Sequence, residues 1–124
     1  LWSPTGDRIS YLAASGALRV VPAQGGASRQ LVRPGLRGVL GWSPDGRRIA
    51  FSDAKGRLAV VDVTTGRVRS LLKLRLPYGP PGVVWSPDSQ ELLVVWRPPA
   101  GSHCPSGLWR VPADGAKPRL VHGC

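Results

Sequence analysis

The chain has 124 residues, of which 42% are hydrophobic, so its length fits one folded domain and its composition excludes a disordered tail. It carries 17 Lys and Arg against 7 Asp and Glu, and the resulting net charge of +10 favours anionic partners. No apolar run approaches the roughly 18 residues of a membrane-spanning helix, and 16 Gly and 13 Pro between short apolar runs indicate an all-β protein.

The first residues belong to a segment that recurs twice. The copies start at Trp2, Trp42 and Trp85, which are 40 and then 43 residues apart. A period near forty is typical of the four-stranded blade of a propeller. The conserved positions of the repeat are Trp2, then Trp42, Ser43, Pro44, Asp45 and Gly46, and then Trp85, Ser86, Pro87 and Asp88.

Short strands separated by turn residues follow each copy in register. We expect strands at 8–13, 18–21 and 28–32, then at 38–42, 47–53, 58–63 and 67–72, and finally at 83–85, 91–96, 108–111 and 118–122. Several of them are apolar on both faces, as in 58–63, which indicates cover on both sides. Stacked blades provide that cover. The blades then occupy about residues 1–34, 38–75 and 83–124 of a single domain.

The sequence therefore predicts an all-β fold, a β-propeller with three four-stranded antiparallel blades. Three blades form only a partial ring, because closure needs roughly four to eight. Either further blades of a longer protein complete a ring of six to eight, or two chains pair. The first residue lies inside a motif, which favours the longer protein, and exposed blade faces favour self-association.

The middle repeat carries the family resemblance. Trp42-Ser43-Pro44-Asp45-Gly46, followed by Arg-Arg-Ile-Ala-Phe-Ser at 47–52, resembles the WD-like repeat of the TolB-like propeller family. The first copy departs from it at Thr5 and the third at Ser89. The resemblance covers all three units. It implies a non-catalytic scaffold of the bacterial cell envelope, in the periplasm or at the cell surface, often attached to lipoproteins or transmembrane partners.

Two enzymatic alternatives remain open. One is the propeller domain of a prolyl-oligopeptidase-type serine peptidase, whose hydrolase domain would need a Gly-x-Ser-x-Gly motif that this sequence lacks. The other is a propeller lyase acting on acidic sugars, which needs converging histidines or metal ligands, and only His103 is well placed for that role. Ser86 and Asp45 are not expected to be catalytic, because no base accompanies them at a fixed offset. We expect no catalytic residues in this chain.

The longer connections between strands are expected at one rim of the stack. Strand direction alternates, so 33–37, 73–82 and 97–107 share that rim, while the motif turns lie at the other. Long loops on a rigid scaffold commonly carry function, and these contain no Asp or Glu. We expect an acidic partner or ligand there, against the alternative of solvated loop charges. The candidate residues are Arg33, Arg37, Lys55, Lys73, Arg75, Tyr78, Arg97 and His103.

The basic residues show no pattern typical of nucleic-acid binding. No compact cationic cluster with interleaved aromatic residues is present. Arg67 and Arg69 lie on a predicted outermost strand, where charges keep an exposed edge from pairing with other sheets. Nucleic acid is therefore not an expected partner.

Cys104 and Cys124 are the only cysteines, and they flank a predicted hairpin whose turn is Asp114-Gly115. Pairing across that hairpin brings them close together, which predicts a disulfide and an oxidising, extracytoplasmic setting. His103 and His122 lie beside them, and the four residues could in principle ligate zinc. Their spacing matches no standard zinc finger, so we expect no metal and no cofactor, and free thiols remain the other alternative.

Overall fold

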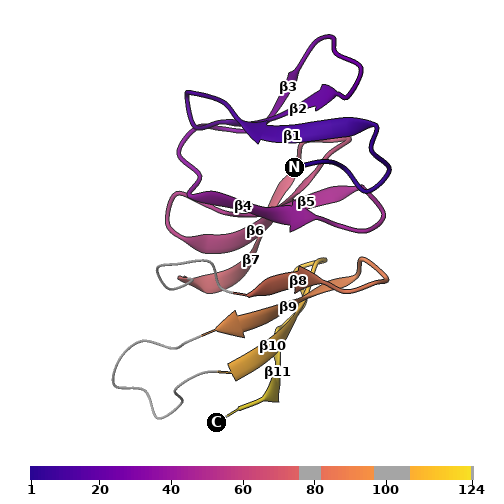
Figure 1. The fold of residues 1–124 in the computed structure, drawn as a ribbon. Helices are drawn as coiled ribbons and strands as arrows, with labels where there is room; N and C mark the ends of the chain where they lie inside the picture. The colour runs from indigo at the N-terminus through magenta and orange to yellow at the C-terminus, as the bar shows by residue number, and fades with distance from the viewer. Residues whose placement is uncertain (76–81, 97–106, 124) are drawn as a thin grey trace.

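The protein is a stack of three antiparallel sheets, each forming one blade of a β-propeller. The computed structural model describes residues 1–75, 82–96 and 107–123. The sheets lie face to face and follow one another in chain order (Figure 1). Every regular element of the described residues is a strand, and none of them forms a helix long and apolar enough to cross a membrane. The predicted all-β fold of stacked blades is confirmed.

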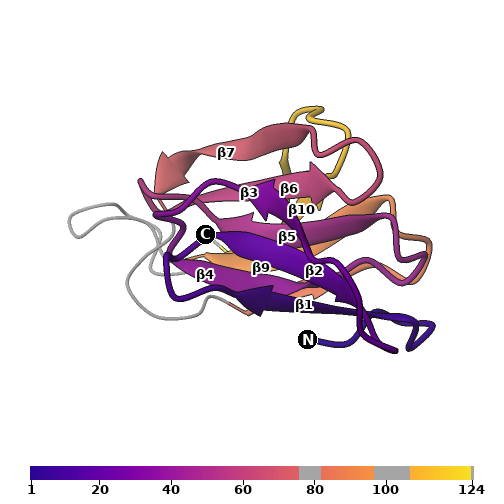
Figure 2. The same cartoon turned by 90° about the horizontal axis from the view of Figure 1, so that it is seen from above.

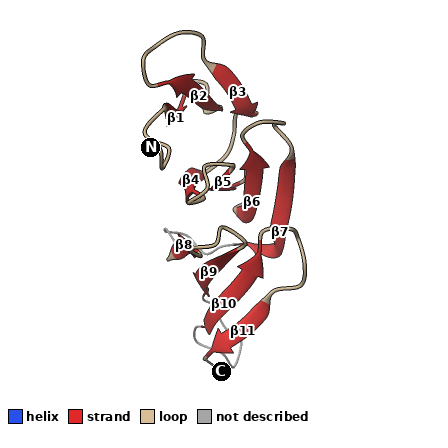
Figure 3. Cartoon of the chain, turned by 90° about the vertical axis from the view of Figure 1, so that its right-hand side faces the viewer, coloured by secondary structure: helices blue, strands red, loops and turns tan. Residues whose placement is uncertain are grey.

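The strands follow the predicted order closely. Blade 1 contains β1 (Arg8–Leu12), β2 (Leu18–Pro22) and β3 (Arg29–Val32). Blade 2 contains β4 (Gly38–Trp42), β5 (Arg48–Ser52), β6 (Arg57–Asp62) and β7 (Val68–Arg75). Blade 3 contains β8 (Val83–Trp85), β9 (Glu91–Trp96), β10 (Gly107–Pro112) and β11 (Arg119–His122). Within each blade, every strand pairs with the next one along the chain. The first strands β4 and β8 therefore lie at one edge of the stack, and the last strands β7 and β11 lie at the other (Figure 3).

Blade 1 differs from the prediction of four strands. Its sheet has three, and the place of a first strand is taken by an isolated bridge between Trp2 and Ile9. The backbone oxygen of Leu1 also accepts a hydrogen bond from the Ser10 N–H at 2.8 Å. Leu1 and Trp2 therefore occupy the place of the first strand in blade 1.

Strand β7 is longer than the predicted segment 67–72. It continues to Arg75, whose Cα pairs with that of Arg57 across a register shift between Arg57 and Ala59. Residues 72–75 alternate apolar and charged types, a period-two pattern typical of a strand. The irregular pairing lets the strand run past the position where the sequence suggested a loop.

The core consists of two apolar layers, one between each pair of blades. Blade 2 contributes to both layers because its strands alternate, with Val61 packed toward blade 1 and Val60 toward blade 3. Phe51 is 1% exposed and is among the largest fully buried side chains. Burying such a side chain contributes roughly 1.5–3 kcal/mol, so these layers hold the blades in place. The expected cover on both faces of the middle strands is observed.

The motif turns are closed by hydrogen bonds of their own side chains. Ser43 Oγ donates to Asp45 Oδ1 at 2.6 Å and accepts from the Arg48 N–H at 3.0 Å. The tryptophan that precedes the turn reaches the blade before it. Trp42 Nε1 donates to Ser10 Oγ at 3.0 Å. In the third copy, Trp85 Nε1 likewise donates to the Gly41 carbonyl at 3.1 Å.

The third motif copy places a serine where a glycine is easier to accommodate. Ser89 has a φ of 62°, close to the 72° of Gly46 in the second copy. A left-handed backbone is unfavourable for a residue with a Cβ. Ser89 Oγ accepts a hydrogen bond from the Asp45 N–H at 3.0 Å, and this contact between blades offsets the strain.

Candidate binding surfaces

The β1–β2, β3–β4 and β5–β6 connections lie at one end of the stack, which we call the long-loop rim. Corresponding strands of the three blades run in similar directions, so their corresponding ends lie together when the stack is viewed from above (Figure 2). A Cβ on Gly16 would lie 3.4 Å from the Gly35 nitrogen, and one on Gly35 would lie 3.8 Å from the Ala54 Cβ. Three connections from two blades therefore form one continuous surface.

The described part of this rim is cationic. Arg33, Arg37 and Lys55 all lie on it with exposed side chains. The Arg37 N–H donates to the Ser52 carbonyl at 2.9 Å, which fixes the β3–β4 connection against blade 2. The structure thus brings together these three predicted residues from two separate connections.

Asp53 is the acid next to these cations, and its carboxylate accepts hydrogen bonds within its own turn. It accepts hydrogen bonds from the Lys55 and Arg57 N–H groups, each at 2.9 Å, and pairs with Arg57 Nε at 3.2 Å. Burial raises the pKa of Asp53, but these hydrogen bonds and the Arg57 charge outweigh it and hold the pKa below 3.8. Asp53 thus closes the β5–β6 turn.

Acidic residues are concentrated at the opposite rim, where the motif turns lie. Of the seven acids in the chain, Asp53 alone belongs to the long-loop rim. The others lie in or beside the short turns: Asp7, Asp45, Asp62, Asp88, Glu91 and Asp114. Cations occur at both rims, so the two ends of the stack differ in the number of acids that accompany them.

The structure describes only some of the remaining residues that were predicted for the long-loop rim. Lys73 and Arg75 belong to strand β7 and not to a loop, with the Arg75 backbone opposite Arg57 at the rim end. Tyr78, Arg97 and His103 lie outside the described residues. Their part in the rim stays a prediction.

The predicted cysteine pair also lies outside the described residues, at Cys104 and Cys124. The hairpin between them has the expected register near its turn, where Trp109 pairs with Leu120. A shift between Leu108 and Trp109 then moves the pairing by one residue, so that Leu108 lies opposite His122. The disulfide stays a prediction. Within the described ranges no three His, Cys, Asp or Glu side chains gather as a metal site would require.

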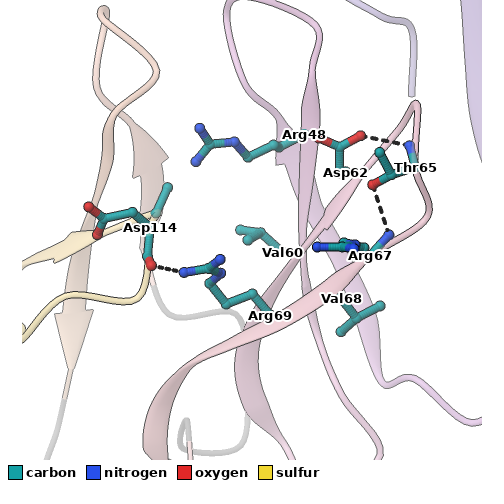
Figure 4. A pocket seen from close by; sticks show the side chains of 9 residues that line it. Arg48, Val60, Asp62, Thr65, Arg67, Val68, Arg69 and Asp114 are labelled. Carbon is teal, nitrogen blue, oxygen red and sulfur yellow. Dashed lines mark hydrogen bonds between the residues drawn. The ribbon is translucent and has the colours of Figure 1, made fainter.

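A groove that the sequence did not predict lies between blades 2 and 3. Its volume is about 720 Å³. Its walls come from β5, β6, β7 and the turns beside them, and from the β10–β11 turn of blade 3 (Figure 4). We call it the inter-blade groove. Its lining residues are Arg48, Val60, Asp62, Thr65, Arg67, Val68, Arg69, Ala113 and Asp114.

An arginine on β7 closes one side of this groove. Arg69 Nη1 donates to the Asp114 carbonyl of blade 3 (Figure 4). The equivalent residue of blade 1, Arg29, donates to the Val63 and Thr64 carbonyls of blade 2 at 3.3 and 3.0 Å. The outer-strand arginine therefore links successive blades, a role beyond the edge protection that the sequence suggested.

The groove could have been found by comparing equivalent positions of the repeats. Arg48, Asp62 and Arg67 form one row across blade 2, since Arg48 pairs with Asp62 and the Asp62 N–H donates to the Arg67 carbonyl. The matching row of blade 1 contains Pro22 opposite Arg8. The polar row is thus a departure from the repeat, a signal that is visible only once the strand register is known.

Comparison with known proteins identifies structural relatives. No protein-family model and no curated protein matches the chain. A TolB candidate from Agrobacterium tumefaciens is 24% identical, with a TM-score of 0.72 over 98% of this chain and 44% of that one. TolB from Acinetobacter baumannii is 20% identical, with a TM-score of 0.67 over 98% and 36%. An oligogalacturonate lyase from Vibrio parahaemolyticus is 16% identical, with a TM-score of 0.74 over 98% and 38%.

These similarities show the β-propeller fold alone, because proteins of different function share it. An acylaminoacyl peptidase also matches, at 14% identity and a TM-score of 0.64. The chain spans less than half the length of each of these structures.

Proposed function

We propose that the chain is part of a non-catalytic binding propeller of the cell envelope, and that its long-loop rim binds an acidic surface of another protein. The observation that carries the proposal is the uneven distribution of acids between the two rims. Arg33, Arg37 and Lys55 lie together on one continuous surface, whereas six of the seven acids belong to the opposite rim. At the motif rim acids and cations are interspersed, whereas Asp53 is the one acid beside Arg33, Arg37 and Lys55, so an acidic surface meets less repulsion at the long-loop rim.

The fold leaves both enzymatic alternatives open, because peptidase and lyase propellers share it. The scaffold role is favoured by two considerations that do not depend on the fold. The repeat resembles the TolB-like form at Trp42–Gly46, and the motif side chains close their own turns by hydrogen bonding. Ser43 Oγ and the Asp45 carboxylate are thus used to close the turn.

Binding to fluorescently labelled poly-L-glutamate tests the rim. We expect the triple variant R33E/R37E/K55E to bind at least tenfold more weakly than the unaltered chain at low salt, since each exposed ion pair contributes up to about 1 kcal/mol. The matched control is R47E/K117E/R119E, which changes the net charge equally at exposed positions elsewhere. Equal losses in both variants would show that net charge alone drives binding and would contradict the proposal. A parallel titration with polygalacturonate separates an acidic protein from an acidic polysaccharide, and tighter binding of the latter would favour the lyase alternative.

We also propose that the protein works outside the cytoplasm. Support comes from the resemblance of its repeat to the TolB-like form and from the predicted disulfide between Cys104 and Cys124. Mass spectrometry of the intact chain, with thiol alkylation before and after reduction, tests this pairing. Alkylation of both thiols before reduction would contradict it.

The outer faces of blades 1 and 3 favour self-association. Trp2 is 63% exposed, and on blade 3 Val84 and Val95 are 62% and 49% exposed. Large exposed apolar side chains on a sheet face mark contact surfaces. We expect the chain to form dimers or larger species in sedimentation velocity, and the Trp2→Arg variant to shift the population to monomer. A monomer at every concentration of the unaltered chain would contradict this expectation.

A further inference from the structure

The inter-blade groove combines cationic, acidic and apolar groups from two blades. Arg48, Arg67 and Arg69 enter the same space between blade 2 and the β10–β11 turn (Figure 4). The Arg69 guanidinium donates a hydrogen bond to the Asp114 carbonyl. Among the described residues, no hydrogen bond or ion pair engages the guanidinium groups of Arg48 and Arg67, which leaves two planar donors facing the groove.

At the equivalent interface between blades 1 and 2, the matching arginine is held by contacts with blade 2. There Arg8, the counterpart of Arg48, lies with its guanidinium carbon 5.6 Å from the centroid of the Trp42 ring. It also donates to the Gly46 carbonyl at 3.4 Å. Arg8 is therefore part of the packing between blades. Arg48 makes neither contact within the described part of the chain, and its charge instead acts on the neighbouring Asp62 carboxylate, where it helps to lower the pKa.

Asp62 lies between the two arginines and limits which anion fits. Its Oδ1 accepts the Thr64 and Thr65 N–H groups, each at 2.8 Å, and these bonds outweigh burial and hold its pKa below 3.8. The carboxylate is thus ionised at neutral pH. A fixed negative charge beside Arg48 and Arg67 disfavours a dianion, while the Asp62 carboxylate, whose two oxygens offer about four acceptor positions, can accept a further hydroxyl proton.

The base of the groove is apolar. Val60 and Ala113 are each 3% exposed and come from different blades. A cavity near 720 Å³ lies within the range of small-molecule sites. Guanidinium groups bind carboxylates through two parallel hydrogen bonds. A ligand that satisfies all these groups carries one carboxylate, several hydroxyls and a carbon chain.

We propose that the inter-blade groove binds a small polyhydroxy monocarboxylate. Its carboxylate binds the guanidinium groups of Arg48 and Arg67, a hydroxyl donates to the Asp62 carboxylate, and its carbon chain packs on Val60 and Ala113. This site is separate from the long-loop rim, because Asp62, Thr65 and Asp114 belong to turns at the opposite end of the stack.

Isothermal titration calorimetry with sodium D-gluconate tests the site, alongside acetate, glucose and orthophosphate. We expect gluconate to bind at least tenfold more tightly than the other three, since each lacks the carboxylate or the hydroxyls or carries excess charge. Arg48→Gln and Arg67→Gln should each weaken gluconate binding about tenfold, the loss expected for one charge-assisted contact. Arg47→Gln is the matched control, because this exposed neighbour does not line the groove.

A second measurement does not depend on variants folding correctly. In the unaltered chain, gluconate should shift the backbone amide signals of Thr65 and Asp114 in NMR spectra and leave that of Lys55 unchanged. Tighter binding of phosphate or acetate, an equal loss in Arg47→Gln, or shifts confined to the long-loop rim would each overturn the proposal. The variant R33E/R37E/K55E should keep its affinity for gluconate, so failure of the groove and failure of the rim are distinguishable.

Discussion

Replacing Trp42 by phenylalanine perturbs the contact that joins blade 2 to blade 1. Its indole Nε1 donates to Ser10 Oγ at 3.0 Å in a buried position, and Arg8 lies over the ring at 5.6 Å. The hydrogen bond contributes about 1 kcal/mol and the cation–π contact about 0.5–1 kcal/mol, and the smaller ring loses some packing. We expect the free energy of unfolding to fall by about 2–3 kcal/mol.

A double-mutant cycle isolates the hydrogen bond. Ser10→Ala removes the acceptor and leaves the indole N–H without a partner, which costs about 1–3 kcal/mol. If the two groups interact as described, the combined variant W42F/S10A is less destabilised than the sum of the single variants by about 1 kcal/mol. Urea unfolding followed by circular dichroism measures all four species.

The control pair uses the tryptophan of the next blade. Trp85 Nε1 donates to the Gly41 carbonyl and has no contact with Ser10, so W85F/S10A should be additive within about 0.5 kcal/mol. A coupling energy near zero for W42F/S10A, or one equal to that of the control pair, would refute this account of how the motif tryptophan links the blades.

Three further predictions concern the core, the strained turn and pH. Phe51→Ala should lower the free energy of unfolding by about 3–5 kcal/mol, because the side chain is 1% exposed between two blades; a loss below about 1 kcal/mol in urea unfolding would show that this layer is loosely packed. Ser89→Ala should lower the free energy of unfolding by about 1 kcal/mol, because the hydrogen bond from the Asp45 N–H is lost. Ser89→Gly should be nearly neutral, because relief of the positive φ offsets that loss. Thermal unfolding that ranks the two variants in the opposite order would contradict this reasoning. Asp53 has a lowered pKa in the folded chain, so its carboxylate stabilises the fold above 3.8 and this contribution disappears as the pH falls through the lower folded value. Asp53→Asn should therefore be less stable than the unaltered chain at pH 7 and close to it near pH 2, and a stability difference that does not depend on pH would exclude the proposed role.

The strand order could be predicted from the repeat because each motif copy fixes where a turn must occur. Trp42 to Gly46 begins the pattern, and the alternation that follows identifies β5 and β6 within one residue. The end of β7 could not be predicted in the same way. No turn residue marks it before Arg75, and a register shift beside Arg57 lets the pairing continue.

The sequence predicted one candidate site, the long-loop rim, but not the other, the inter-blade groove. Arg33, Arg37 and Lys55 follow from strand alternation alone, because connections at the same end of antiparallel strands must lie together. The inter-blade groove depends on which face each strand residue occupies, and that requires the register. Arg67 and Arg69 therefore read as edge charges in the sequence, although the structure directs them toward blade 3.

The central claim is that recognition takes place on the long-loop rim while the motif turns are structural. An NMR titration of the isotopically labelled chain with poly-L-glutamate tests this directly. We predict shifts in the backbone amide signals of residues 33–37 and 54–57, and unchanged signals for the motif turns at 43–46 and 86–89. Shifts centred on the motif turns, or spread evenly over the cations of both rims, would contradict the claim.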